Sequence, residues 1–255
     1  MSAGVHAQHA QHPVVDADRW LAERKTLLAR EKEVLRLQDE LARARRELPW
    51  RRVDEYVFDA PEGRRSLADL FEGRSQLIVQ HFMLGPGWEQ GCPSCSYMAD
   101  HADGMTVHLA ARDVSFAAVS RAPLAEIERF KARMGWKFRW VSSAGSDFNR
   151  DFHVSFDAAD RIDGTVEYNY HRTDFPSSEA PGISVFCRDD AGAVFHTYST
   201  FGRGVEAMMG TYRLLDLVPS GRGERDDAPN KMEWVRHHDR YAARSRSDAC
   251  CHAKA

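Results

Sequence analysis

The segment QLIVQHFMLGPGWEQGCPSCSYMAD (residues 76–100) decides the fold class of this chain. Its first seven residues are mostly apolar and predict a buried strand. Glycine and proline then predict a turn over residues 83–91, and residues 92–111 have the composition of a helix. The motif Cys92-Pro93-Ser94-Cys95 therefore stands where a strand passes into a helix.

The same alternation of strand and helix continues along the chain. The sequence predicts a helix at residues 123–134, with Pro123 in its first turn, and a helical segment at 204–215. Turn-forming residues at 188–192 predict a hairpin. Strands are expected at residues 53–58, 114–119, 138–141, 166–170, 183–187 and 193–198. This order predicts an α/β fold with a mixed central sheet flanked by helices.

A long amphipathic helix is predicted before the sheet, over residues 19–49, with Pro49 at its end. Over residues 18–52 there are 11 Lys or Arg and 7 Asp or Glu, a surplus of 11 − 7 = +4. Charges of both signs around an aliphatic stripe favour packing along its own domain or a sister subunit over a basic nucleic-acid-binding or coiled-coil arm. The stripe recurs every seventh residue, at Trp20, Leu27, Val34, Leu41 and Leu48.

Four regions follow from these patterns. We expect a disordered tail over residues 1–18, the helix over 19–49, one α/β domain over 50–218, and a C-terminal extension with a loose end over 219–255. Trp234 and Tyr241 are the residues expected to dock the extension onto the domain.

Composition excludes several classes of protein. Apolar residues make up 43% of the 255 residues, which indicates a globular chain, and five cysteines are too few for a fold built on disulfides. The net charge, 35 − 38 = −3, argues against a nucleic-acid partner. No apolar run is long enough to span a membrane, and residues 1–15 do not resemble a secretory signal. We therefore expect a cytoplasmic protein with no nucleic-acid or membrane partner.

The CxxC motif is the strongest candidate for chemistry. Unpaired N–H groups at the start of a helix stabilise a thiolate, so Cys92 is the candidate nucleophile. Cys95 lies one turn later, where its thiol can attack a mixed disulfide and release the product. This mechanism needs no organic cofactor and no metal.

Two other interpretations of the motif stay open. A zinc or iron–sulfur site needs further ligands, and no second CxxC or HxxxH block exists in the sequence. Cys92 and Cys95 are otherwise two buried, inert thiols. Of the remaining cysteines, Cys187 is expected to be buried and inert in a core strand, and Cys250 and Cys251 to lie idle in the tail.

Pro181 directly precedes the strand expected at 183–187. Thioredoxin-like proteins have a cis-proline at this place, facing the CxxC motif across the substrate groove, and the order and spacing here are similar. Because X–Pro bonds are cis in only about 5–6% of folded cases, an ordinary trans bond is the alternative.

Longer blocks carry a resemblance to one family. HFMLGPGWEQGCPSCS (81–96), VSRAPLAEIERFKARMGW (119–136), FNRDFHVSF (148–156) and VFHTYSTFGRG (194–204) resemble a bacterial thioredoxin-like family of unknown function, whose members are predicted dithiol–disulfide oxidoreductases. The similarity extends from about Trp20 to Tyr241 and implies a thioredoxin-like fold. The chain departs from thioredoxin itself, because Gly91 replaces the tryptophan before the first cysteine. Glu89 stands where a peroxiredoxin has threonine, which disfavours peroxidase chemistry of that kind.

The sequence thus leads to one main hypothesis and two rivals. Cys92 and Cys95 are the expected catalytic residues, and Pro181, Trp88 and Arg203 are the expected contacts to a protein or small-molecule thiol or disulfide. The first rival is a redox sensor or binding module on the same fold. The second is an assembly protein that forms a homodimer through the N-terminal helix.

Overall fold

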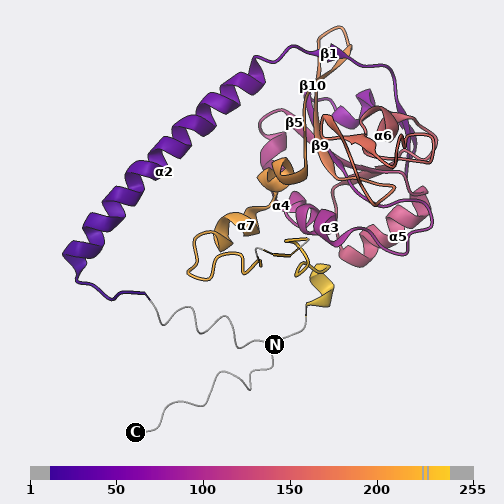
Figure 1. Cartoon of the computed structure of the whole chain (residues 1–255). Coiled ribbons are helices and arrows are strands. Elements are labelled where there is room, and N and C mark those ends of the chain that lie inside the picture. Colours follow the sequence, from indigo (N-terminus) through magenta and orange to yellow (C-terminus); the bar gives the residue numbers. More distant parts are fainter. Residues whose placement is uncertain (1–11, 226, 229, 242–255) are drawn as a thin grey trace.

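The computed structural model describes residues 12–225, 227–228 and 230–241. Its centre is an eight-stranded sheet with the strand order β1-β10-β9-β4-β5-β6-β2-β3 (Figure 1). The strands are β1 (Arg51–Arg52), β2 (Val57–Ala60), β3 (Gly63–Ser66), β4 (Gln76–His81), β5 (Val114–Ser120), β6 (Arg139–Ser142), β9 (Gly182–Arg188) and β10 (Val194–Phe201). A separate hairpin joins β7 (Val166–Tyr168) to β8 (His171–Thr173).

The order and direction of the central strands make the fold thioredoxin-like. β4 is parallel to β5, and β5 is parallel to β6. β4 also pairs with β9 in the antiparallel direction, and β9 forms a hairpin with β10. A βαβ unit that carries the CxxC motif is therefore extended by an antiparallel hairpin, as the sequence predicts.

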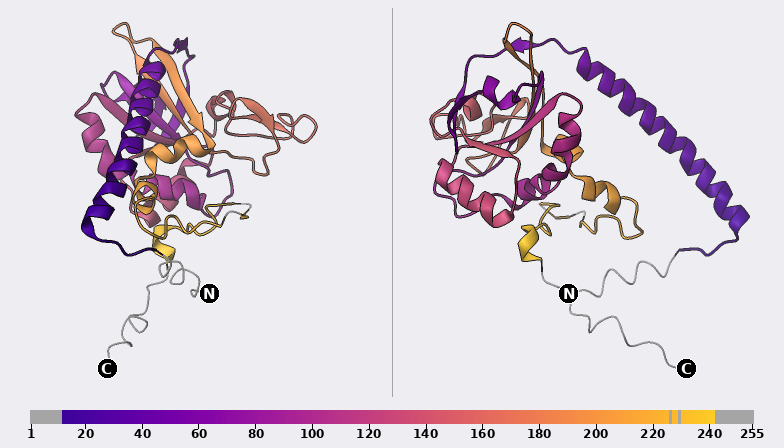
Figure 2. Two further views of the ribbon diagram at one scale, coloured as in Figure 1. Left: turned by 60° about the vertical axis from the view of Figure 1, so that its left-hand side comes forward. Right: turned by 180° about the vertical axis from the view of Figure 1, so that it is seen from behind.

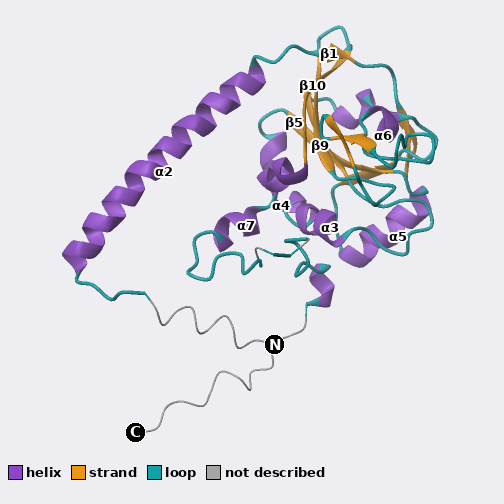
Figure 3. Ribbon diagram, in the orientation of Figure 1, coloured by secondary structure: helices purple, strands orange, loops and turns teal. Residues whose placement is uncertain are grey.

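Helices and short turns cover both faces of this sheet (Figure 3). One face packs against α3 (Pro93–Ala99), α4 (Ala102–Ala110), α5 (Leu124–Met134), the 3₁₀ segment η3 (Gly202–Met208) and α7 (Gly210–Leu215). The other face packs against η2 (Ala68–Phe71), α6 (Phe148–Asp151) and the β7–β8 hairpin. A last 3₁₀ turn, η4, spans His238–Arg240.

Helix α5 illustrates how the sequence sets these contacts. Ile127, Phe130 and Met134 recur on one face and are buried against the sheet. Gly135 ends the helix with a φ of 70°, a left-handed conformation that glycine adopts without steric cost. The segment predicted as a helix at residues 123–134 is confirmed.

The long N-terminal helix, α2 (Ala17–Arg46), stands away from the sheet (Figures 1 and 2). Asp16 caps it by accepting a hydrogen bond from the Arg19 N–H at 2.8 Å, and none of its residues is buried. The helix ends three residues before Pro49, which disfavours helical geometry in the residue before it. No helix in the described part of the chain is long and apolar enough to cross a membrane.

Three expectations about secondary structure need correction. Of the strand expected at 53–58 only the last two residues are extended, in β2, and the preceding strand β1 lies outside that range and pairs with β10. The helix expected at 92–111 is broken at Asp100–His101 into α3 and α4. The stretch 142–163, which holds none of the helices expected above, contains α6.

Candidate dithiol site

The loop after β4 positions the first cysteine. The Cys92 N–H donates to the Met83 carbonyl at 3.0 Å, which closes the loop on the end of the strand. Cys92 has extended backbone angles at the start of α3, and Pro93 follows as the first helical residue. Both the N–H and the hydroxyl of Ser96 donate to the Cys92 carbonyl at 2.9 Å. The Cys92 thiol is therefore held between the loop after β4 and the start of α3, as the sequence predicts.

The two thiols of the motif have opposite electrostatic environments. Both cysteines are free thiols, with Cys92 partly exposed and Cys95 1% exposed. A hydrogen bond from the Cys95 thiol, followed by hydrogen bonds from Cys95 N–H and Ser94, lowers the pKa of Cys92 to about 6 although burial opposes this shift. The Cys92 thiolate and burial raise the pKa of Cys95. Cys92 is thus the thiolate and Cys95 the protonated partner at neutral pH.

The ends of neighbouring strands enclose Cys95. The Met83 N–H hydrogen-bonds to its sulfur, and Gln80 Nε2 donates to its carbonyl oxygen at 3.0 Å. The Tyr168 side chain lies close enough for a Cys95 thiolate to contribute to its raised pKa, although burial is the main cause. Tyr168 Oη donates to the Pro181 carbonyl at 2.8 Å. Tyr168 therefore hydrogen-bonds to the proline before β9, and its relation to Cys95 is a minor charge interaction.

Pro181 lies at the end of the sheet where β4 passes into the cysteine loop. His81, the last residue of β4, is paired with Gly182, the first residue of β9. Pro181 therefore lies just beyond the paired residues, beside the start of the loop that leads to the cysteines. The described residues contain no cis peptide bond, so the trans alternative holds and the thioredoxin-like cis geometry is absent here. The local sequence allows both isomers, and the tertiary structure selects one.

Trp88 and Arg203 have different surroundings. Trp88 is partly buried and packs against the core cluster that contains Cys95, with Cys92 packed against the same cluster. The side chain of Arg203 is 87% exposed and forms an ion pair with Glu206 at 3.0 Å. Trp88 therefore packs on the same core cluster as Cys92, whereas the contacts of Arg203 do not connect it to the cysteines. Their substrate-binding roles stay predictions.

The packing around Gly91 explains why this site has no tryptophan before its first cysteine. A Cβ atom on Gly91 would lie 2.5 Å from Phe82 Cε1 and 2.8 Å from Phe130 Cε1. Both rings belong to the core of this face. Any larger residue would force these rings apart, because packed interiors have little free space.

The C-terminal segment closes over the same residue. His237 is 2% exposed, and its Nε2 lies 2.9 Å from the Gly91 carbonyl oxygen. Burial lowers the pKa of His237, so the ring is neutral and Nε2 donates to Gly91 while Nδ1 accepts from Arg133 at 3.4 Å. Trp234 packs against the core as the sequence predicts, whereas Tyr241 is 46% exposed and does not.

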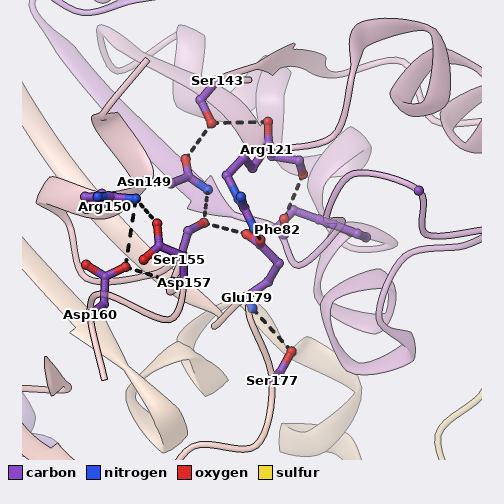
Figure 4. Close-up of polar contacts among 12 residues, drawn as sticks. Phe82, Arg121, Ser143, Asn149, Arg150, Ser155, Asp157, Asp160, Ser177 and Glu179 are labelled. Carbon is purple, nitrogen blue, oxygen red and sulfur yellow. Dashed lines mark hydrogen bonds and ion pairs between the residues drawn. The ribbon is translucent and has the colours of Figure 1, made fainter. Parts of the chain in front are cut away.

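A buried polar network surrounds Glu179, two residues before Pro181 in the sequence (Figure 4). Glu179 is 1% exposed and accepts from Arg121 Nε at 2.9 Å and from Ser155 at 2.5 Å. Asn149 connects Ser155 to Ser143. Burial raises the pKa of Glu179 although Arg121 and Ser155 oppose the shift. The segment before Pro181 is thereby tied to the turn after β5.

The remaining cysteines stand apart from this pair. Cys187 on β9 is half-buried, not buried as expected, because it lies near the end of its strand. Cys250 and Cys251 are outside the described residues. Within the residues that the structure describes, no group of three or more His, Cys, Asp or Glu is arranged to hold a metal ion.

A family model described as "Bacterial protein of unknown function (DUF899)" matches residues 9–241. The chain belongs to this family. No curated protein is similar enough to this DUF899 protein to match it.

Solved structures are similar to this DUF899 protein at low identity. Peroxidoxin BcpB from Mycobacterium tuberculosis is 14% identical, with 66% of this chain and 97% of that chain covered and a TM-score of 0.41. A PrxQ mutant from Xylella fastidiosa is 10% identical, with 65% and 94% covered and a TM-score of 0.42. A putative thiol:disulfide interchange protein DsbE from Chlorobium tepidum is 14% identical, with 65% and 95% covered and a TM-score of 0.38.

Two contacts of the DUF899 site were missed from the sequence. His237 and Glu179 stand outside the motif, and neither lies in a periodic pattern that points to it. The only local signal is the position of Glu179, two residues before Pro181.

Proposed function

We propose that this protein is a dithiol–disulfide oxidoreductase that acts through Cys92 and Cys95. The observation that carries the proposal is the asymmetry of the two thiols, since the site lowers the pKa of Cys92 and raises that of Cys95. A thiolate is the nucleophile in disulfide exchange, and the partly exposed position of Cys92 gives a substrate access to it. The position of Pro181 supports the proposal, because it directly precedes β9 next to the strand end that leads into the cysteine loop.

The reaction has two balanced steps. The Cys92 thiolate attacks one sulfur of a substrate disulfide, a Cys92–substrate disulfide forms, and the other substrate sulfur leaves as a thiolate that takes a proton from water. Loss of the Cys92 negative charge removes the main cause of the raised Cys95 pKa. Cys95 then gives its proton to water, and its thiolate attacks Cys92 Sγ, which releases the second substrate sulfur as a thiolate. The substrate disulfide is reduced by two electrons, and the Cys92 and Cys95 thiols are oxidised to a disulfide.

A second turnover requires an external thiol or dithiol that reduces this disulfide by the reverse steps. Such a reductant is abundant in the cytoplasm, where we propose that the protein works. The substrate is a protein or small-molecule disulfide.

The test is a single-turnover reaction of the reduced protein with hydroxyethyl disulfide, followed by peptide mass mapping. The wild-type chain is expected to form a Cys92–Cys95 disulfide. Cys95→Ser should stop at a mixed disulfide on Cys92, Cys92→Ser should leave Cys95 unmodified, and Cys187→Ser should behave as the wild type. If Cys92 reacts no faster than Cys187, the proposal is wrong.

Multiple turnovers with glutathione as the reductant separate the enzyme from its main rival. An oxidoreductase accelerates reduction of the model disulfide above the uncatalysed rate. A redox sensor forms the Cys92–Cys95 disulfide once and gives no acceleration.

A further inference from the structure

The apolar stripe of α2 is uncovered in the single chain. The helix has 30 residues and buries none of them. Trp20 is 60% exposed and Leu37 is 63% exposed, and the other large apolar residues of the stripe are exposed as well: Leu21, Leu27, Leu28, Val34, Leu35 and Leu41. Monomeric proteins rarely leave a continuous apolar surface of this length in water.

We propose that α2 pairs with α2 of a second copy of this chain as an antiparallel two-helix coiled coil. The inference is independent of the proposed redox function. Its basis is the seven-residue spacing of Trp20, Leu27, Val34 and Leu41, which keeps one seam facing a partner helix. Leu37 and Ala44 occupy the second seam position in the C-terminal half of the helix.

The charges favour a protein partner over a membrane surface. A helix that lies in a membrane interface carries mainly Lys and Arg on its polar face. The sequence of α2 instead intersperses acidic residues such as Glu33, Asp39 and Glu40 among its basic ones. Arg24 and Glu31 form an ion pair at 2.8 Å along the helix.

The seam residues select the antiparallel direction. Glu23 and Arg30 occupy the second seam position in the N-terminal half. Parallel helices would set Glu23 against Glu23 and Arg30 against Arg30 of the partner, which places like charges together at the seam. Antiparallel helices avoid both pairings.

One antiparallel register also matches side-chain size and charge. If Leu27 lies opposite Leu37 of the partner, Trp20 lies opposite Ala44, so the largest seam residue meets the smallest. An antiparallel pair of identical helices has a two-fold axis at its middle. Near this axis the same register brings Arg30 beside Glu33 of the partner. The N-terminal half of each helix then covers the C-terminal half of the other.

Contacts at the end of α2 are compatible with this arrangement. The Arg45 guanidinium lies over the Tyr198 ring, 5.4 Å from its centroid, and the Trp50 ring is 5.9 Å from that of Phe195. These contacts attach the helix to β10 near its C-terminal end only. The stripe beyond them stays accessible to a second copy.

Light scattering of the full chain under reducing conditions tests the pairing. We expect twice the mass of one chain for the wild type and the mass of one chain for Leu27→Glu/Leu41→Glu. Ala22→Glu/Ala29→Glu adds the same charge on the outer face and should keep the double mass. Leu27→Ala/Leu41→Ala, which retains helix-forming residues, should raise the dimer dissociation constant at least about tenfold. A wild type with the mass of one chain, whether or not it binds anionic vesicles, overturns the proposal.

Paired substitutions test the direction. In the antiparallel register Ala44→Trp sets two tryptophans against each other and weakens the dimer, and Trp20→Ala/Ala44→Trp restores it. In a parallel pair the second substitution gives no recovery, because residue 44 then faces residue 44 of the partner. Failure of the double variant to recover overturns the antiparallel arrangement.

Discussion

The imidazole Nε2 of His237 lies 2.9 Å from the carbonyl oxygen of Gly91, the residue before Cys92, although 146 positions separate them in the sequence. The same ring packs edge-on against Phe130, which also contacts the position of Gly91. The C-terminal segment is therefore part of the dithiol site and holds the loop that carries the nucleophile.

His237→Ala should lower the free energy of unfolding by about 1–3 kcal/mol, because the buried Gly91 carbonyl loses its partner. Release of the loop should also slow alkylation of Cys92. Urea unfolding and iodoacetamide labelling check the two effects. His238→Ala is the matched control, since that side chain is exposed and bonds to Asp100 instead. Equal behaviour of the two variants would contradict the role of His237.

Arg121→Leu should destabilise the fold more than Arg121→Leu/Glu179→Leu. The single variant leaves the carboxylate of Glu179 buried without its cation, whereas the double variant removes both charges. We expect a loss of about 2–4 kcal/mol for the single variant, less than for a fully buried pair because the Arg121 side chain is 34% exposed. Guanidinium unfolding measures both variants. A double variant no more stable than the single one would show that the pair is not coupled.

Acid should destabilise the protein through its buried histidines. Burial lowers the pKa of His81 to about 3 and also lowers the pKa of His196. Between pH 3 and the ordinary histidine value of about 6.5 the unfolded chain binds a proton at His81 that the folded chain does not. This group therefore lowers the free energy of unfolding by about 1.4 kcal/mol for each pH unit below 6.5.

Urea unfolding of His81→Gln from pH 7 to pH 5 checks this sign. The variant should lose part of the wild-type pH dependence, although it is less stable at pH 7. His153→Gln, on the exposed surface, controls for the substitution itself. An unchanged slope in His81→Gln would contradict the assignment.

Gly91→Ala should destabilise the fold by about 1–3 kcal/mol through overpacking. The added methyl group would meet the Phe82 and Phe130 rings at 2.5 and 2.8 Å. Gly87→Ala, in the same loop, meets no neighbour within 4 Å but has a φ of 78°, so it controls for backbone strain separately from packing. Thermal unfolding of both variants and of Phe82→Leu/Gly91→Ala, which removes the main clash, distinguishes the two causes.

Local patterns in the sequence were sufficient for the framework of the site. The apolar run of β4, the turn after it and the start of α3 place Cys92 and Cys95 correctly, because each depends on neighbouring residues. The β9–β10 hairpin follows for the same reason. Pro181 was placed correctly before its strand, but its peptide isomer depends on tertiary contacts that no local pattern encodes.

Contacts between distant segments could not be predicted. Arg121 and Glu179 are 58 positions apart, and both are charged residues that normally lie at the surface. His237 follows a loop without periodicity. The pairing of β1 with β10 likewise joins segments far apart in the chain, and local alternation does not determine it.

The most direct test of the central claim is the pH dependence of Cys92 alkylation, followed by peptide mass mapping of the reduced protein. Because hydrogen bonds from Cys95 and Ser94 stabilise the thiolate, we predict a midpoint at about pH 6 in the wild type. Cys95→Ala, which removes the main hydrogen-bond donor, should raise this midpoint. A wild-type midpoint near that of an unperturbed cysteine, about 8.5, would contradict the assignment of Cys92 as the nucleophile.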